Sequence, residues 1–219
     1  CKDNTFPQML LMTELAHDAA DRIYRAIVAS TPEMKTLMPI LRPYDTIGST
    51  RYVDFDTTRP VYRTDPRKCH ISHVVADTDT WEQKMAQALE DMDEVVYYVK
   101  NHNLGFTIPY TLTGEEHGYI PDFIVRIALT PDPSPKDGRG EILNLVLEVS
   151  GEARKDTAAK VATARNLWVP AINNHGGFGR WAFLEISDPW DAQNTIRAFF
   201  DDENVDPSRS PFPHSSIIR

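Results

Sequence analysis

Two carboxylates, Asp122 and Glu148, lie in segments whose composition and order are typical of neighbouring β-strands. Asp122 closes Tyr-Ile-Pro-Asp at 119–122 and precedes an apolar run, and Glu148 lies inside Leu-Val-Leu-Glu-Val-Ser-Gly at 145–151. Strand side chains alternate between two faces, so Glu148 and Ser150 point away from the leucines beside them. We expect one face of this strand to pack and the other to bring the two carboxylates together.

A shared divalent cation is the chemistry that such a pair favours. Two nearby carboxylates repel one another, which raises the pKa of at least one, and an unpaired glutamate is costly to bury in an apolar strand. Mg²⁺ prefers oxygen ligands and keeps several waters, and Mn²⁺ accepts similar ligands. A bound metal lowers the pKa of water and neutralises charge on a phosphate. The simpler interpretation of Asp122 is a turn or strand-edge residue after Pro121.

Further short blocks follow one another in order over about residues 45–185. They are Gly-Ser-Thr-Arg-Tyr-Val-Asp-Phe (48–55), Trp-Glu (81–82), Val-Lys-Asn (99–101), Leu-Gly-Phe-Thr-Ile-Pro-Tyr (104–110), Tyr-Ile-Pro-Asp-Phe (119–123), Leu-Glu-Val-Ser-Gly (147–151), Trp-Val-Pro-Ala-Ile-Asn-Asn (168–174) and Gly-Arg-Trp-Ala-Phe (179–183). As an ordered set, they resemble the C-terminal endonuclease domain of the restriction subunit (Res) of type III restriction enzymes. The nuclease core of that family carries the PD-(D/E)xK signature.

The resemblance implies an α/β fold with a restriction-endonuclease-like core, a mixed central β-sheet flanked by helices. It implies a Mg²⁺-dependent endonuclease, for which Mn²⁺ could substitute, that hydrolyses phosphodiester bonds of double-stranded DNA. It also implies an upstream helicase-like motor in the same polypeptide, a separate modification (methyltransferase) subunit and a prokaryotic cytoplasm. No Gly-x-x-x-x-Gly-Lys-Ser/Thr loop occurs here, so ATP would act only through that motor. The start at Cys1 leads us to expect a fragment of a longer chain.

The chain departs from the family pattern at Ser150, where the family usually has a lysine. A serine hydroxyl cannot act as a cation, and removing one group that stabilises the transition state typically costs about 2.7–4 kcal/mol. Lys155 or Lys160 could supply the missing charge, because both follow on an alanine-rich segment, 152–165, that favours a helix. Two helical turns advance only about 11 Å, so such a lysine could reach back. The alternative is a solvated helix face.

The remaining site predictions are a third metal ligand and a set of DNA contacts. Glu82 in the Trp-Glu block and Glu94 are the candidate third acids, and Glu90 lies one helical turn from Glu94. Each could instead be a solvated helix acid. The candidate DNA-binding residues follow the second carboxylate: Arg154, Lys155, Arg165, Asn173, Asn174 and Arg180.

Periodicity divides the chain into a helical segment (1–44), a β-rich extension (45–77), a core of alternating helices and strands (78–200) that the resemblance implies is nuclease-like, and a polar tail (201–219). We expect a helix at 8–29, a hairpin of 51–56 with 60–63, and a third strand at 70–76. In the core we expect a helix at 81–99, strands at 106–112, 119–129 and 142–149, a helix at 152–165, a strand at 181–186 and a helix at 192–200.

Composition restricts the remaining alternatives. No apolar run is long enough to predict a membrane span. The two cysteines predict no disulfide framework, and Cys69, His70 and His73 are too few ligands for a structural zinc. The net charge of -9 counts against strong DNA binding by this piece alone. Besides an active nuclease, the sequence therefore leaves open an impaired nuclease fold that holds DNA or docks a subunit, and an α/β domain unrelated to nucleic acid.

Overall fold

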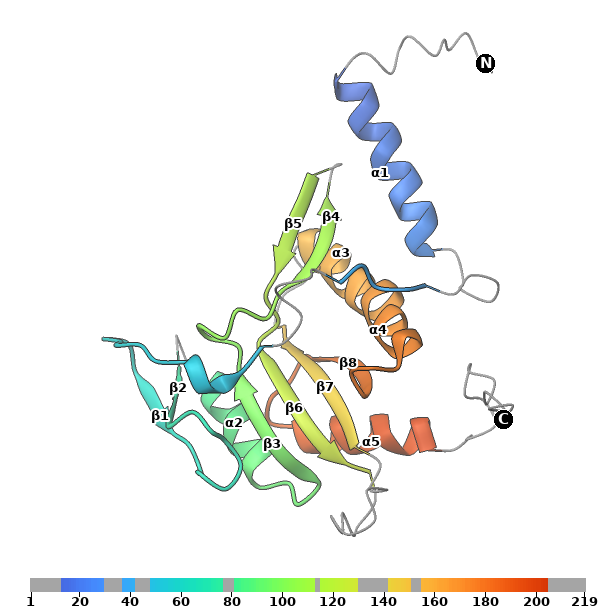
Figure 1. The fold of residues 1–219 in the computed structure, drawn as a ribbon. Helices are drawn as coiled ribbons and strands as arrows, with labels where there is room; N and C mark the ends of the chain where they lie inside the picture. The colour runs from blue at the N-terminus through green and yellow to red at the C-terminus, as the bar shows by residue number, and fades with distance from the viewer. Residues whose placement is uncertain are drawn as a thin grey trace, which may run out of the picture.

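A four-stranded mixed sheet forms the centre of the computed structural model, which describes residues 13–29, 37–41, 48–76, 81–112, 115–129, 142–150 and 155–204 (Figure 1). The strand order is β3 (Val95–Lys100), β6 (Phe123–Ala128), β7 (Ile142–Val149) and β8 (Arg180–Ile186). The first three strands are antiparallel neighbours, and β8 lies parallel to β7. Helices flank this sheet, so the expected α/β class with a mixed central sheet is confirmed.

Both faces of β7 pack, each against a different layer. Leu143, Leu145 and Leu147 are buried in the larger core, which includes α2 (Trp81–Glu90) and α5 (Ala192–Asn204). Val146, on the opposite face, is buried in a second core. That core includes α3 (Lys155–Thr163), the π-helical segment η3 (Ala164–Trp168), α4 (Val169–His175) and the hairpin of β4 (Ile108–Leu112) with β5 (Glu115–Tyr119). The face that carries Glu148 therefore also packs, at Val146, which the sequence did not predict.

The segment before the core differs from the expected arrangement. It consists of α1 (Thr13–Ala29), a short 3-10 turn η2 (Thr50–Tyr52), β1 (Val61–Arg63) and β2 (His73–Val75). The helix expected at 8–29 is confirmed from Thr13 onward, and residues 8–12 lie outside the described residues. The expected hairpin of 51–56 with 60–63 is wrong, because β1 pairs with β2 and the Ser49 hydroxyl caps the η2 turn.

The predicted helix at 81–99 is right only in its first half. The helix α2 ends at Glu90, and β3 begins at Val95. Val95, Val96, Tyr97, Tyr98 and Val99 are β-branched or aromatic, and such side chains favour a strand that can pair on one edge with β6. The helical spacing of apolar residues continued past Glu90 by coincidence, so the periodicity was misleading.

Two further boundaries were misplaced. The strand expected at 119–129 is split, because β5 ends at Tyr119 and β6 begins at Phe123, with Pro121 between them unable to donate a backbone hydrogen bond. The strand at 106–112 corresponds to β4, which pairs with β5 in a separate two-stranded sheet. The helix expected at 152–165 continues as η3 and α4 to His175, where Gly176 (φ 72°) ends it. Residues 130–141, most of them in an expected loop, lie outside the described residues.

A half-buried carboxylate attaches the β1–β2 segment to the core. Glu90, the last residue of α2, accepts hydrogen bonds from the hydroxyls of Tyr62 and Tyr98, both at 2.6 Å, and from the backbone N–H of Asp65 at 2.7 Å. Three donors satisfy this carboxylate, which explains how a charged group lies beside the larger core. Glu90 therefore has a structural role.

Candidate metal centre at the end of the sheet

Asp122 and Glu148 meet where β6 begins and β7 ends. The antiparallel register pairs Phe123 with Leu147, which sets Asp122 opposite Glu148. The backbone N–H of Val149 donates to Oδ2 of Asp122 at 2.8 Å, and this bond fixes the carboxylate against the end of β7. The hydroxyl of Tyr119 donates to Oε2 of Glu148 at 2.7 Å. Both carboxylates are half-buried, so they converge without being sealed in the core.

The environment makes this pair difficult to ionise fully. Burial, followed by the charge of Asp122, raises the pKa of Glu148 from 4.5 to about 7. Burial also raises the pKa of Asp122, although the N–H of Val149 and the charge of Lys100 act in the opposite direction. Burial and the neighbouring Glu148 raise the pKa of Tyr119, which stays a neutral donor. Near neutral pH the two carboxyls therefore share protons that a cation could displace.

An ion pair lies on the other side of Asp122. Nζ of Lys100, at the end of β3, lies 2.6 Å from Oε1 of Glu82, and both side chains are mostly buried. The same ammonium donates to the carbonyl of Val75 at 2.7 Å, which links β2 to the site. Lys100 lowers the pKa of Asp122 and Glu82 raises it, so both act on the carboxylate pair. Of the two candidate third acids, the structure brings Glu82 to this end of the sheet.

Lys160 approaches the pair from the second core. It lies on α3 with its Nζ 5.9 Å from the ring centroid of Tyr110, and its charge lowers the pKa of Glu148. Ser150 directly follows β7, and its backbone N–H donates to the carbonyl of Ile186. The side chain of Lys155 and all of Arg154 lie outside the described residues. Lys160, the lysine of this helix whose side chain the structure describes, therefore lowers the pKa of Glu148.

The two carboxylates of Asp122 and Glu148 are few metal ligands, but they can accommodate a magnesium ion. Among the described residues, no group of three or more His, Cys, Asp or Glu side chains is arranged to hold a metal. Mg²⁺, however, commonly uses one or two protein carboxylates and completes its shell with water and substrate phosphates. Asp122 and Glu148 are adjacent and partly accessible, and burial raises the pKa of both. These two residues would hold the ion.

Glu94 lies far from this pair. It precedes Val95, which pairs with Ile127, whereas Lys100 pairs with Phe123 beside Asp122. The 6 residues of β3 separate the two ends by about 20 Å. Glu94 binds the guanidinium of Arg197 at 2.8 Å. The interpretation of Glu94 as a metal ligand is therefore wrong.

Two of the candidate DNA contacts after Glu148, Asn173 and Asn174, have side chains that are hydrogen-bonded within the protein. Asn173 donates to the carbonyl of Trp181 and accepts from its N–H, both at 2.8 Å, so its amide connects α4 to β8. Asn174 donates to the carbonyl of Leu37. The guanidinium of Arg165 lies 5.9 Å from the ring centroid of Phe183. Arg180 begins β8, and its carbonyl accepts from Asn144. The structure gathers none of these four at the carboxylate pair.

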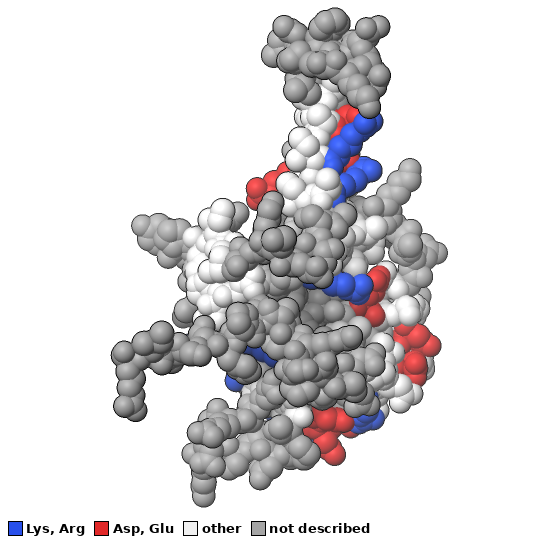
Figure 2. Space-filling view, turned by 90° about the vertical axis from the view of Figure 1, so that its right-hand side faces the viewer, with Lys and Arg blue, Asp and Glu red and all other residues white. Residues whose placement is uncertain are grey.

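The face shown in Figure 2 has no extended basic surface among its described residues. Blue and red side chains lie next to one another on the described part of the face shown, and no continuous blue band covers it. On α1, for example, Arg22 pairs with Asp18 at 2.9 Å.

Two residues that contact or influence the pair were missed. Lys100 lies in the Val-Lys-Asn block just after the helix expected at 81–99, and Tyr119 opens the Tyr-Ile-Pro-Asp block, but neither is among the predicted site residues. The sequence signal for Lys100 was its position after a run of β-branched and aromatic residues. Cys69 is buried and its thiol pKa is raised by burial, which fits the expected structural interpretation.

Comparisons of the chain with protein-family models, with curated proteins and with solved structures gave no match. None of the described helices combines the length and apolar character needed to cross a membrane.

Proposed function

We propose that this chain is a Mg²⁺-dependent DNA endonuclease domain, of the kind found in the restriction subunit of type III restriction enzymes. The observation that carries the proposal is the convergence of Asp122 and Glu148 at the end of neighbouring strands. The order α2, β3, β6, β7, α3 and β8 supports a restriction-endonuclease-like core, since it is the helix, strand, strand, strand, helix, strand order expected of that core. The β4–β5 hairpin is then an insertion between the first two core strands.

Each residue of the site has a separate role in the proposed hydrolysis. Asp122 is oriented by the N–H of Val149, and Glu148 is oriented by the hydroxyl of Tyr119. Mg²⁺, or Mn²⁺ in its place, would bind these two carboxylates, activate water and neutralise charge on the scissile phosphate. Lys160 supplies a cation on the Glu148 side, in the role that lysine at position 150 would otherwise have. Lys100, bound by Glu82, supports the ionised form of Asp122.

The substrate and partners follow from the same proposal. Double-stranded DNA would be delivered by a helicase-like motor of the same polypeptide, which would use ATP, and a separate modification subunit would select the sequence. The setting would be a prokaryotic cytoplasm. The net charge of -9 supports this dependence on delivery, because the chain has little general attraction for DNA.

A second candidate function is a nuclease fold that holds DNA or docks a subunit without cutting. Ser150 favours it, because the usual cation is absent from the strand that bears Glu148. So does the small donor set, in which no described third acid, His or Cys completes a metal group.

The test is nicking of a supercoiled plasmid by the full-length protein with its partner subunit, ATP and Mg²⁺. We expect Glu148→Gln to abolish nicking while leaving the protein folded. Glu94→Gln is the matched control, because it removes the same charge at the opposite end of β3. Metal-dependent nicking that persists in Glu148→Gln, or its absence from the natural protein, would contradict the nuclease proposal.

The role of Lys160 can be separated from that of Ser150 in the same assay. Lys160→Met should lower the nicking rate by about 100- to 1000-fold, the usual effect of removing one stabilising group. Ser150→Lys should restore part of this loss in the double variant. If Ser150→Lys raises the rate of the natural protein but Lys160→Met has no effect, Lys160 does not serve as the cation.

A further inference from the structure

The sheet face that carries the carboxylate pair continues in two rows of side chains toward β3, the edge strand of this sheet. Residues paired across strands point to the same face. The register aligns Val99, Ile124 and Val146 in one row, and Tyr97, Arg126 and Asn144 in the next. Alternation puts Arg126 on the same face as Asp122, four residues and about 13 Å away. The second row is open where it reaches the edge, because Tyr97 is 40% exposed and Arg126 is exposed.

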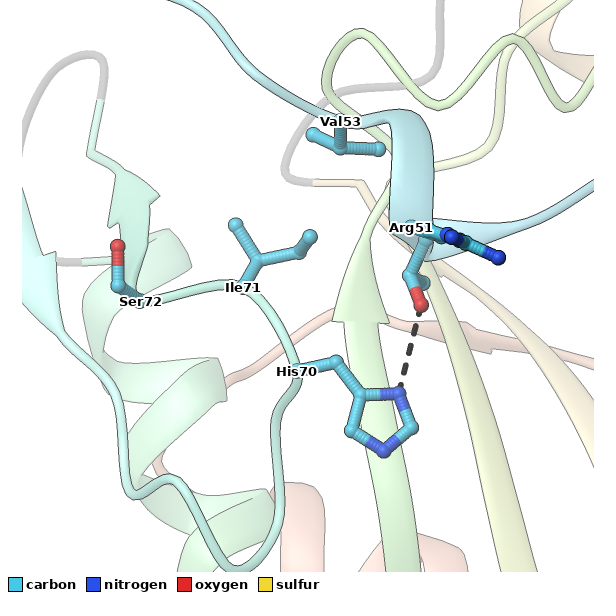
Figure 3. Close-up of a pocket in the computed structure, with 6 residues that line it drawn as sticks. Arg51, Val53, His70, Ile71 and Ser72 are labelled. Carbon is cyan, nitrogen blue, oxygen red and sulfur yellow. Dashed lines mark hydrogen bonds between the residues drawn. The ribbon is translucent and has the colours of Figure 1, made fainter.

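A pocket adjoins the edge end of the second row. It has a volume of about 450 Å³ and is lined by Thr50, Arg51, Val53, His70, Ile71 and Ser72. Figure 3 shows that η2 forms one side and the 70–72 loop the other, with the Thr50 hydroxyl against Nδ1 of His70 at 3.4 Å. The lining therefore combines two hydroxyl-bearing residues and a histidine with two aliphatic residues, and the Arg51 side chain extends away from His70 and Ser72 at its margin (Figure 3).

One ring contact connects the pocket to the sheet. The His70 ring lies against the Tyr97 ring with centroids 4.7 Å apart. Tyr97 is directly opposite Arg126 across the β3–β6 ladder. Pocket, Tyr97 and Arg126 thus form a continuous surface that leads from the extension to the face bearing the carboxylates.

The two arginines of this surface differ from others on the protein. The Arg67 guanidinium is held by Asp65, and the Arg197 guanidinium by Glu94. The guanidinium groups of Arg51 and Arg126, in contrast, have no ion pair with any described residue, although both are exposed. An exposed guanidinium without an acid partner is well suited to a phosphate, which it can bind with two parallel hydrogen bonds.

We propose that this surface binds the sugar-phosphate backbone of DNA, with one phosphate at Arg51, on the margin of the pocket, and another at Arg126. Thr50, His70 and Ser72 supply further donors in the pocket, and the Tyr97 ring offers an aromatic face to a sugar or base between the two phosphates. This inference rests on the proposed function and specifies where the substrate lies. It replaces the residues after Glu148 as the principal DNA contacts.

The experiment measures DNA affinity of the full-length protein in EDTA by fluorescence anisotropy, over a series of salt concentrations. EDTA prevents cleavage, so binding is measured separately from the nuclease proposal. The probes are a short labelled duplex, the same sequence as a single strand, and a nucleoside monophosphate as competitor. Arg51→Gln and Arg126→Gln are compared with Arg67→Gln, a control that removes an equal charge from a guanidinium already held by Asp65. Thermal unfolding checks that all three variants are folded.

We expect Arg51→Gln and Arg126→Gln each to weaken duplex binding by about fivefold. Each should also reduce the slope of log affinity against log salt by about 0.9, since one phosphate contact is lost. Arg67→Gln should change neither quantity. The inference is overturned if the first two variants match Arg67→Gln, or if the natural protein binds no duplex. It is also overturned if a nucleoside monophosphate occupies the pocket with the full affinity of the duplex, because the site would then take a free nucleotide.

The two proposals can fail separately. If Arg51→Gln and Arg126→Gln lose affinity but the natural protein shows no metal-dependent nicking, the DNA surface is supported and only the nuclease function is rejected. Conversely, intact nicking and unchanged affinity would reject only the surface.

Discussion

Replacing Glu148 by glutamine should stabilise the metal-free protein at alkaline pH. The folded protein raises the pKa of this carboxyl from 4.5 to about 7, mainly by burial and then by the charge of Asp122. Ionised Glu148 is therefore unfavourable in the folded state. Glutamine keeps the side-chain volume and an oxygen that can accept from Tyr119, but it carries no charge.

The magnitude follows from linkage between protonation and folding. A rise from 4.5 to about 7 corresponds to an upper limit of about 3 kcal/mol, at 1.36 kcal/mol per pKa unit. Because the carboxyl is only half-buried, solvent screening reduces this to about 1–2 kcal/mol. For a chain of 219 residues this corresponds to a melting temperature higher by about 2–8 °C in the variant.

The sign of the pH dependence is definite. A raised pKa means that the favourable contribution of Glu148 is fully present below its unfolded pKa of 4.5 and is lost as pH rises through about 7. The variant and the natural protein should therefore have similar stability near pH 4 and diverge up to about pH 8. Urea denaturation followed by circular dichroism measures the difference at each pH.

Added Mg²⁺ provides a second measurement of the same effect. Millimolar Mg²⁺ or Mn²⁺ should raise the melting temperature of the natural protein near pH 8, because the cation neutralises the two ionised carboxylates, and should have little effect on Glu148→Gln. If the variant is less stable than the natural protein at pH 8, or if the difference does not depend on pH, the reasoning about the pair is refuted.

Four further substitutions test particular contacts and one backbone conformation. Tyr119→Phe should lower the nicking rate by about tenfold and raise the apparent pKa of its pH profile, because the hydroxyl that stabilises ionised Glu148 is lost; an unchanged profile would contradict a positioning role. Glu90→Ala should destabilise the protein by about 2–4 kcal/mol in urea, since it leaves three donors without an acceptor. Glu94→Ala, at an exposed pair, should cost less than about 1 kcal/mol in the same titration. Gly176→Ala should lower the melting temperature slightly, because the residue has φ 72° and the left-handed conformation costs about 1 kcal/mol for alanine.

The successful predictions share a local origin. The strand at 142–149 and the α5 helix were placed well because each has one clear apolar period and strong flanking signals. The failures are at 81–99 and 119–129, where one apolar run contains two elements. In the first, a helix and a strand both fit the spacing of apolar residues, and only pairing with β6 decided in favour of the strand.

By itself, the sequence determined the α/β class, the two carboxylates and their positions at the ends of neighbouring strands, because strand alternation and turn residues act over a few positions. Only the tertiary structure decided which other charges surround them. Lys100, paired with Glu82, lies near enough to shift the pKa of Asp122, whereas Glu94 binds Arg197 at the other end of the sheet, because β3 begins near Glu94 and ends at Lys100. The position of a side chain relative to a site depends on strand direction and register, which arise from long-range pairing.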